Sequence, residues 1–333
     1  MKTCRLMKTV LGIVSTGVAL SILSVFAFGA ELPEQALSHA NPRVQEVMTV
    51  QEAVTPDLMS MPDVLGTAVG QDDSGEPTIL VYVNLEGKNP SASARNIPRS
   101  LRGESITVEF TEPFSALVRP VAVTKVSHTA KQTPPIQLGT SGGWGYDLAN
   151  GYCCGGTLGS LIQIGGNQYI LSNFHVFESD IVAGGNNRVA TTGDPIIQPG
   201  LIDVGCIASN AQTVATLVKR RSLPTSNVDA SVAQVEKGMV SPDGAILEIG
   251  PISSGTIGPA INQAVKKSGR TTRLTRSKIS GLNATVSVAY DNECAGGAAF
   301  TKTFTGQIII SNRASKFLAG GDSGSLMVED VTL

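Results

Sequence analysis

The second half of the chain is a succession of short runs of β-forming residues, and this pattern limits the possible folds most. From Tyr152 onward the runs read GTLGSLIQI, YILS, RVATT, DASVAQV, ATVSVAY, GQIII and GSLMV, with Gly, Asn and Asp clusters between them. No long helical pattern alternates with these runs, which argues against a parallel α/β sheet. The abundance of Gly (36) and Pro (17) also fits many turns. The pattern predicts an all-β barrel or sandwich.

The first 30 residues have the pattern of an export signal. A basic start is followed by the uncharged stretch 10–30, and small residues at its end offer a cleavage site before Glu31. An uncleaved membrane anchor is the alternative, because about 20 apolar residues span a bilayer. Both interpretations place the rest of the chain outside the cytoplasm, secreted or extracytoplasmic. We expect contact with a membrane only if the leader is retained.

Residues 31–118 are predicted to form a small α+β module. NPRVQEVMTVQEAV has helical spacing with Asn41 as its cap, and IPRSLRG is predicted as a short helix that ends at Gly103. DVLGTAVGQ, TILVYVNL and SITVEF are predicted strands, with the turn-rich DDSGEP after the first. No polar cluster here indicates chemistry, so we interpret the module as a folding or covering prosegment. Residues 119–150 are rich in Pro, Thr, Ser and Gly, and predict a linker or extended arm.

Four cysteines remain once Cys4 has left with the leader, and they are Cys153, Cys154, Cys206 and Cys294. An even number in an exported chain predicts two disulfides. Neighbours in a strand point to opposite faces, so Cys153 and Cys154 are expected to pair with different partners and not with each other. The candidate partners are Cys206 and Cys294, and either assignment is open. No C-x-x-C or H-E-x-x-H spacing occurs, so neither a metal site nor a cofactor is predicted. The net charge of −2 gives no reason to expect a nucleic-acid partner.

Ser323 in GGDSGSLMV is the candidate nucleophile, and its hydroxyl needs a base. Of the histidines His39, His128 and His175, only His175 lies at the end of an apolar run. Asp229 opens a later run and is the candidate for orienting the imidazole. The plainer alternatives are a structural histidine at a strand end and an aspartate that caps a turn.

The order of these three residues along the chain separates the classes of serine hydrolase. In α/β-hydrolases the histidine follows the serine, but no histidine follows Ser323. The order His175, Asp229, Ser323 is that of the chymotrypsin-like proteases.

Several segments of the region 151–333 resemble the trypsin-like (chymotrypsin-fold) serine proteases, and secreted bacterial members most. These segments are CGGTLGSLI, ILSNFHV, VDASVAQV, VKKSGRTTRLTRSKIS and GGDSGSLMV. The resemblance implies a chymotrypsin-like double β-barrel after the N-terminal module. It also implies an endopeptidase that acts on protein or peptide substrates through an acyl-enzyme.

Individual roles follow from the same resemblance. Ser323 would be the nucleophile, His175 the general base and then the acid, and Asp229 the residue that holds the imidazole. The backbone N–H groups of Gly321 and Ser323 would form the oxyanion hole.

The chain also departs from that family. Val176 stands where digestive members have a cysteine, and no Arg-Ile-Val-Gly activation site is present, so Asp322 must be held in another way. Phe317 falls near the expected base of the specificity pocket. The family's further strands do not follow the nucleophile, so we expect a barrel that is incomplete at its C-terminus. The alternative function is a protease-fold protein, or an inactive fragment, that at most binds peptides.

Overall fold

The computed structural model describes residues 37–115, 126–149, 152–178, 188–218, 223, 225–290, 300–310 and 317–331. The predicted leader and Cys294 lie outside these ranges. Among the residues described, no helix has the length and apolarity needed to cross a membrane. Residues 36–333 form one compact unit.

The N-terminal module is built on helix α1 (Pro42–Met59), which begins where the sequence predicts it. The Asn41 side chain accepts hydrogen bonds from the first backbone N–H groups, and a proline occupies the first helical turn. The helix packs on β1 (Val64–Gln71) and β2 (Pro77–Asn84), which pair antiparallel. The third predicted strand is β4 (Glu104–Thr111), and it lies parallel to β2.

The second helix of the module differs from the prediction. It is α2 (Pro90–Asn96), upstream of the predicted IPRSLRG, because Asn89 accepts a hydrogen bond from the backbone of the first turn. The predicted segment instead contains the short strand β3 (Ser100–Leu101), which pairs with β4. Gly103 has φ of 91° in the turn between these strands, so it forms a tight turn and does not end a helix.

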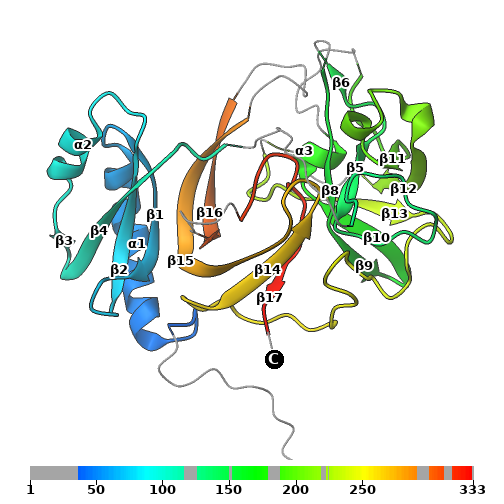
Figure 1. Ribbon diagram of the computed structural model, residues 1–333. Coiled ribbons are helices and arrows are strands. Elements are labelled where there is room, and N and C mark those ends of the chain that lie inside the picture. The colour runs from blue at the N-terminus through cyan, green and yellow to red at the C-terminus, as the bar shows by residue number, and fades with distance from the viewer. Residues whose placement is uncertain are drawn as a thin grey trace, which may run out of the picture. The chain divides into compact units, whose positions relative to one another are not determined.

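One sheet joins the module to the C-terminal part of the chain. Its order is β17-β14-β15-β1-β2-β4-β3, with β16 paired to β15 (Figure 1). The long strand β15 (Arg273–Tyr290) pairs antiparallel with β1. The remaining strands of this half are β14 (Ala264–Gly269), β16 (Phe300–Ile310) and β17 (Met327–Glu329).

The hydrophobic core beneath this sheet is shared by both parts of the chain. Val44 and Val47 of α1 belong to the same buried cluster as Ile279, Leu282 and Phe317. Burial of apolar surface stabilises a fold by about 25 cal/mol per Å². The module and the C-terminal half therefore stabilise each other.

A second sheet is antiparallel throughout and has the order β8-β5-β11-β12-β13-β10-β9. Its strands are β5 (Thr140–Trp144), β8 (Gly156–Leu158), β9 (Ser160–Ile164), β10 (Asn167–Ser172), β11 (Pro195–Gln198), β12 (Gln212–Val218) and β13 (Ser231–Val235). Short elements beside it are β6 (Leu148–Ala149), β7 (Tyr152–Cys153), η1 (Leu201–Asp203) and η2 (Ala208–Asn210). The all-β prediction for this part of the chain is confirmed.

Three details of the predicted organisation are wrong. Strand β5 lies inside the predicted linker 119–150, where Trp144 is fully buried in the core of the second sheet. RVATT forms no strand, because the backbone N–H and hydroxyl of Thr191 both bind the Asp194 carboxylate in a turn. GSLMV is extended only at its end, in β17.

A disulfide joins Cys153 to Cys206, with 5.5 Å between their Cα atoms. Cys154 is disulfide-bonded as well. The prediction that Cys153 does not pair with its neighbour Cys154 is therefore confirmed. Disulfides persist in oxidising compartments, which agrees with an extracytoplasmic location.

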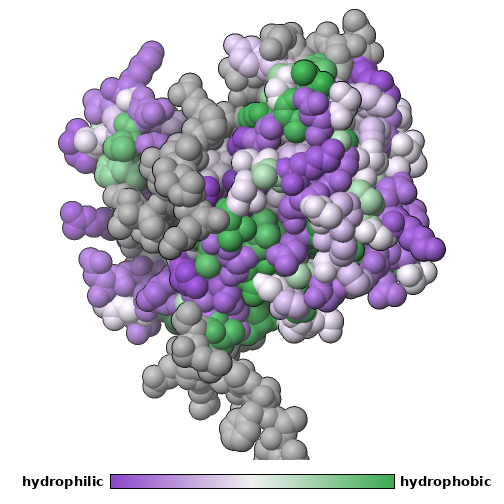
Figure 2. All heavy atoms as spheres, turned by 45° about the vertical axis from the view of Figure 1, so that its right-hand side comes forward, coloured by the Kyte–Doolittle hydropathy of each residue, from purple (hydrophilic) through white to green (hydrophobic). Residues whose placement is uncertain are grey.

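The face of the molecule drawn in Figure 2 is largely hydrophilic, with several separate hydrophobic patches. The most exposed large apolar side chains include Val228 (58%) and Leu318 (57%). Folded proteins ordinarily expose much apolar surface, so scattered residues of this kind need no partner. Leu318 differs from the others because it lines the pocket described next.

Candidate active site

His175 is presented by α3 (Phe174–Phe177), a single helical turn that follows β10. The other three residues of this turn are buried, whereas 19% of the His175 side chain is exposed. The amide of Asn173, which precedes the turn, donates a hydrogen bond of 2.6 Å to the backbone carbonyl of Asp229. The packing of the turn and this bond fix the histidine beside the start of β13.

Asp229 lies directly against the histidine. Its Oδ2 is 2.5 Å from His175 Nδ1, and its Oδ1 accepts a bond of 3.3 Å from the His175 backbone N–H. Burial alone would raise the pKa of Asp229, but the charge and hydrogen bonds of His175 and the Tyr290 hydroxyl hold that pKa below its usual value. An ionised Asp229 keeps the imidazole proton on Nδ1, which directs the acceptor Nε2 away from the carboxylate.

Tyr290 is a residue of the site that the sequence did not reveal. Its hydroxyl donates a hydrogen bond of 2.9 Å to Asp229 Oδ2. Burial, and then the charge of Asp229, raise the pKa of Tyr290, so its hydroxyl stays protonated and remains a donor. The run ATVSVAY indicated only a strand, and which of its side chains meets Asp229 depends on how β15 is placed.

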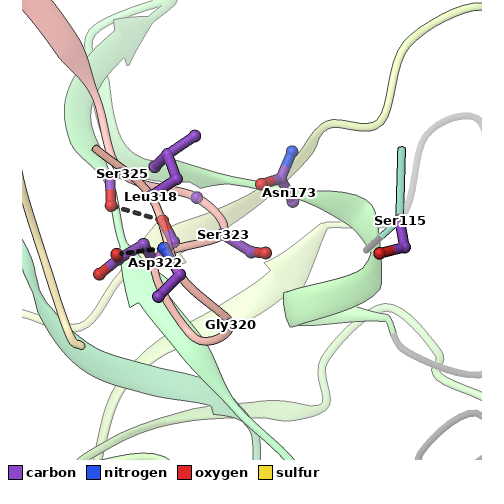
Figure 3. Close-up of a pocket in the computed structure, with 9 residues that line it drawn as sticks. Ser115, Asn173, Leu318, Gly320, Asp322, Ser323 and Ser325 are labelled. Carbon is purple, nitrogen blue, oxygen red and sulfur yellow. Dashed lines mark hydrogen bonds between the residues drawn. The ribbon is translucent and has the colours of Figure 1, made fainter. Parts of the chain in front are cut away.

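Ser323 lies in the loop that precedes β17 and faces a pocket. Its backbone carbonyl accepts a bond of 2.8 Å from the Thr157 N–H, and the Thr157 hydroxyl binds the Gly321 carbonyl at 2.9 Å. Figure 3 shows the Ser323 side chain projecting toward the side of Asn173 and Ser115, away from Asp322 and Ser325. The residues that line the pocket are Ser115, Asn173, Leu318, Ala319, Gly320, Asp322, Ser323, Gly324 and Ser325.

Two glycines give the Ser323 loop its shape. Gly321 and Gly324 have φ of 92° and 91°, a backbone conformation that other residues rarely adopt. A Cβ atom on Gly324 would lie 2.1 Å from the Ser172 hydroxyl. The loop is therefore packed closely against the end of β10, the strand that leads to His175.

Asp322 is held from inside the protein, as the lack of an activation site required. Its carboxylate accepts hydrogen bonds from the backbone N–H groups of Thr271, Thr272 and Ala319, and from the Thr272 hydroxyl. The ammonium of Lys267 lies 3.3 Å from its Oδ2, and both side chains are almost completely buried. Burial lowers the pKa of Lys267, and Asp322 opposes that change. This buried ion pair anchors the loop on β14.

The structure places the predicted site residues in two groups. His175 and Asp229 are in direct contact, while Ser323 and Gly321 share a loop whose pocket also includes Asn173. Phe317, expected near the pocket base, is 6% exposed in the core beside α1. Among the described residues no cluster of His, Cys, Asp or Glu is arranged to hold a metal ion.

Comparison with known proteins finds no matching family model and no matching curated protein. The chain is similar to the solved structure of a glutamic acid-specific serine protease, at 19% identity over 58% of this chain and 79% of that one, with a TM-score of 0.35. It is also similar to Thermobifida fusca protease A (19% identity, 52% and 70% covered, TM-score 0.33). A third is Cellulomonas bogoriensis chymotrypsin (17% identity, 58% and 76% covered, TM-score 0.33). These solved structures are bacterial chymotrypsin-fold serine proteases, the group that the sequence motifs resemble.

Proposed function

We propose that the protein is an exported serine endopeptidase that hydrolyses protein or peptide substrates. The observation that carries this proposal is the 2.5 Å contact between His175 Nδ1 and Asp229 Oδ2, in a site whose neighbouring pocket exposes Ser323. A histidine oriented by a carboxylate is the arrangement that activates a serine hydroxyl. The Cys153–Cys206 disulfide supports a location outside the cytoplasm.

The proposed reaction has two halves. The Ser323 oxygen attacks the peptide carbonyl carbon while its proton passes to Nε2 of His175, and the backbone N–H groups of Gly321 and Ser323 stabilise the oxyanion. The C–N bond then breaks, and the amine leaves with the proton from His175. A water molecule attacks the acyl-enzyme by the same route and restores Ser323. No cofactor or metal takes part in this scheme.

A serine-directed phosphonylating reagent tests the proposal. We expect one adduct, on Ser323, because only a serine activated by a base reacts quickly with such reagents. Mass spectrometry of the digested protein locates the adduct.

Two variants serve as comparisons in this test. Ser325→Ala changes a serine that lines the same pocket but whose hydroxyl donates to the Asp322 carbonyl, so Ser323 should still be labelled in this variant. The His175→Ala variant should lose the labelling of Ser323. An adduct elsewhere, or labelling that survives His175→Ala, would contradict the proposed mechanism, and the absence of any adduct would favour a protein of this fold that only binds peptides.

For the N-terminal module we propose the role of a prosegment that covers the site until it is cut off. Two observations support this role. Strand β1 covers the 282–286 edge of β15, an edge that would otherwise be open to pairing with other chains. The end of the module reaches the candidate site, because Ser115 bridges to Ala289 and lines the pocket of Ser323.

Self-processing would reveal this role. Purified from its native compartment, the unaltered chain should lose the module by a cut between Ser115 and His128, since His128 is already bonded to Gly139 next to β5. The Ser323→Ala variant should keep the module attached. The N-terminal residue of each product is found by mass spectrometry. If both proteins retain residues 37–115, the module is a permanent part of the fold, as its shared core with Ile279 also allows.

A further inference from the structure

Apart from the bond donated by the Tyr290 hydroxyl, every hydrogen bond to the Asp229 carboxylate in the described structure comes from His175. The His175 backbone N–H binds Oδ1 at 3.3 Å, and its Nδ1 binds Oδ2 at 2.5 Å. The hydroxyl of Tyr290, 2.9 Å from Oδ2, comes from a different element, the end of β15. Tyr290 is therefore the anchor of this carboxylate that does not depend on the histidine the carboxylate has to orient.

The ring of Tyr290 is fixed well enough to act as an anchor. It is 5% exposed and stacks on Phe300, with ring centroids 4.9 Å apart and an angle of 6° between the planes. Phe304 packs against it at 6.4 Å, and both belong to the buried cluster that contains Phe174 of α3. The Tyr290 ring also meets the His175 imidazole edge-on, at 5.9 Å. A phenol held on several sides presents its hydroxyl in one position.

We propose that Tyr290 is a positioning residue for the site, whose hydroxyl holds the Asp229 carboxylate in the orientation that accepts the hydrogen bond from His175 Nδ1–H. This inference rests on the proposed function and deepens it. The ring acts at a distance from the reacting atoms, through Asp229 and His175. Tyr290 thereby links β15, the strand that pairs with the N-terminal module, to the position of His175, the proposed base.

The physical reason is that the Asp229 carboxylate could move when His175 changes its charge. During each turnover the imidazole gains and loses a proton, and the strength of its bond to Oδ2 changes with it. A second donor on the same oxygen keeps the carboxylate in place through this cycle. A displacement of about 1 Å at a catalytic group can cost on the order of 100-fold in rate.

The variant Tyr290→Phe removes the hydroxyl and keeps the ring and its stacking on Phe300. We expect kcat to fall about tenfold, which corresponds to loss of about 1.4 kcal/mol of transition-state stabilisation, with KM nearly unchanged. We also expect the low-field proton resonance of His175 Nδ1–H to shift and broaden, because a loosened Asp229 holds this proton less tightly. The resonance is assigned by its disappearance in His175→Gln, and it is measured on the full chain.

Tyr82→Phe is the matched control. Tyr82 is also buried, at 2% exposure, and among the described residues its hydroxyl has no hydrogen-bond partner. It lies on β2, which β1 separates from β15, the strand that carries Tyr290. This variant should leave both kcat and the His175 resonance unchanged. An unchanged His175 resonance in Tyr290→Phe would overturn the inference, as would the same change in both variants.

The two proposals fail in distinguishable ways. If the unaltered protein neither labels at Ser323 nor hydrolyses peptides, but Tyr290→Phe still alters the His175 resonance, the proposed function fails and the positioning role remains. If Ser323 labels and the resonance does not respond to Tyr290→Phe, the protein is a serine hydrolase in which Tyr290 is only structural.

Discussion

Replacing Asp229 with asparagine is expected to slow peptide hydrolysis about 10⁴-fold while the fold stays intact. The Asp229 carboxylate accepts a hydrogen bond from His175 Nδ1–H, with 2.5 Å between Nδ1 and Oδ2. An asparagine whose oxygen takes the Oδ1 position, where the His175 backbone N–H donates, places its NH₂ group at the Oδ2 position, where it meets Nδ1 as a donor. The imidazole then favours the tautomer with the proton on Nε2, which cannot take the proton of Ser323. The rate is measured as kcat on an unstructured protein substrate.

The labelling rate of Ser323 should fall in parallel with hydrolysis in the Asp229→Asn variant. Asp243→Asn is a suitable control, because Asp243 also accepts a side-chain and a backbone hydrogen bond, from Ser241 and Ala245, but is fully exposed. Circular dichroism and Tm show whether each variant is folded. Retention of more than a tenth of the activity in folded Asp229→Asn would mean that another group orients His175.

The contact between His175 and Asp229 was predictable from the sequence because both residues follow or precede strongly β-forming runs. They are 54 residues apart, yet β10 and β13 pair antiparallel, which brings the end of one strand beside the start of the other. The order of His175, Asp229 and Ser323 along the chain then indicated which class of serine hydrolase the motifs resemble.

The anchors of the site could not be predicted in the same way. Tyr290 and Lys267 lie on strands whose periodicity gives two faces, but the element that each face meets depends on the sheet order. Lys267 was hidden further because a lysine in a strand is ordinarily exposed, and here it is 1% exposed. The short helix was misplaced for a local reason: the capping signal at Asn89 outweighs the propensity of IPRSLRG.

The sheet that the N-terminal module shares with the C-terminal half could not be predicted from the sequence either. Each strand of the module was recognisable alone, but its pairing with β15 joins residues more than 200 positions apart, such as Gly66 and Val286. Nothing in local propensity fixes so distant a pairing. The consequence is functional, because the same strand β15 ends at Tyr290 beside Asp229.

Replacing Lys267 with methionine is expected to lower the free energy of unfolding by about 3 kcal/mol and to slow the labelling of Ser323. Removing one partner of a buried ion pair leaves the other charge uncompensated, which costs about 3–5 kcal/mol. The hydrogen bonds that Asp322 receives from Thr271, Thr272 and Ala319 favour the lower end of that range. Urea unfolding of the full chain measures the change.

Lys266→Met is the matched control for this experiment, because Lys266 is the neighbouring lysine of β14 and pairs with Asp330 at 3.2 Å. Its side chain is 20% exposed, and Arg276 also pairs with Asp330, at 2.9 Å, so the carboxylate keeps a cation when Lys266 is replaced. The control should therefore unfold near the urea concentration of the unaltered protein. Labelling of Ser323 should also stay unchanged in it.

The double variant Lys267→Met with Asp322→Asn separates the charge from the shape of the pair. Asparagine keeps an oxygen for the N–H donors of Thr271 and Thr272 but carries no charge, so no carboxylate is left buried without a cation. We expect this protein to be more stable than Lys267→Met alone by about 1–2 kcal/mol, since residues in contact couple by about 0.5–3 kcal/mol. Recovery of Ser323 labelling together with stability would mean that the ion pair sets the shape of the loop. Equal stability of the single and double variants would show that Lys267 acts through its packing and that the charge of Asp322 is satisfied by its hydrogen bonds alone.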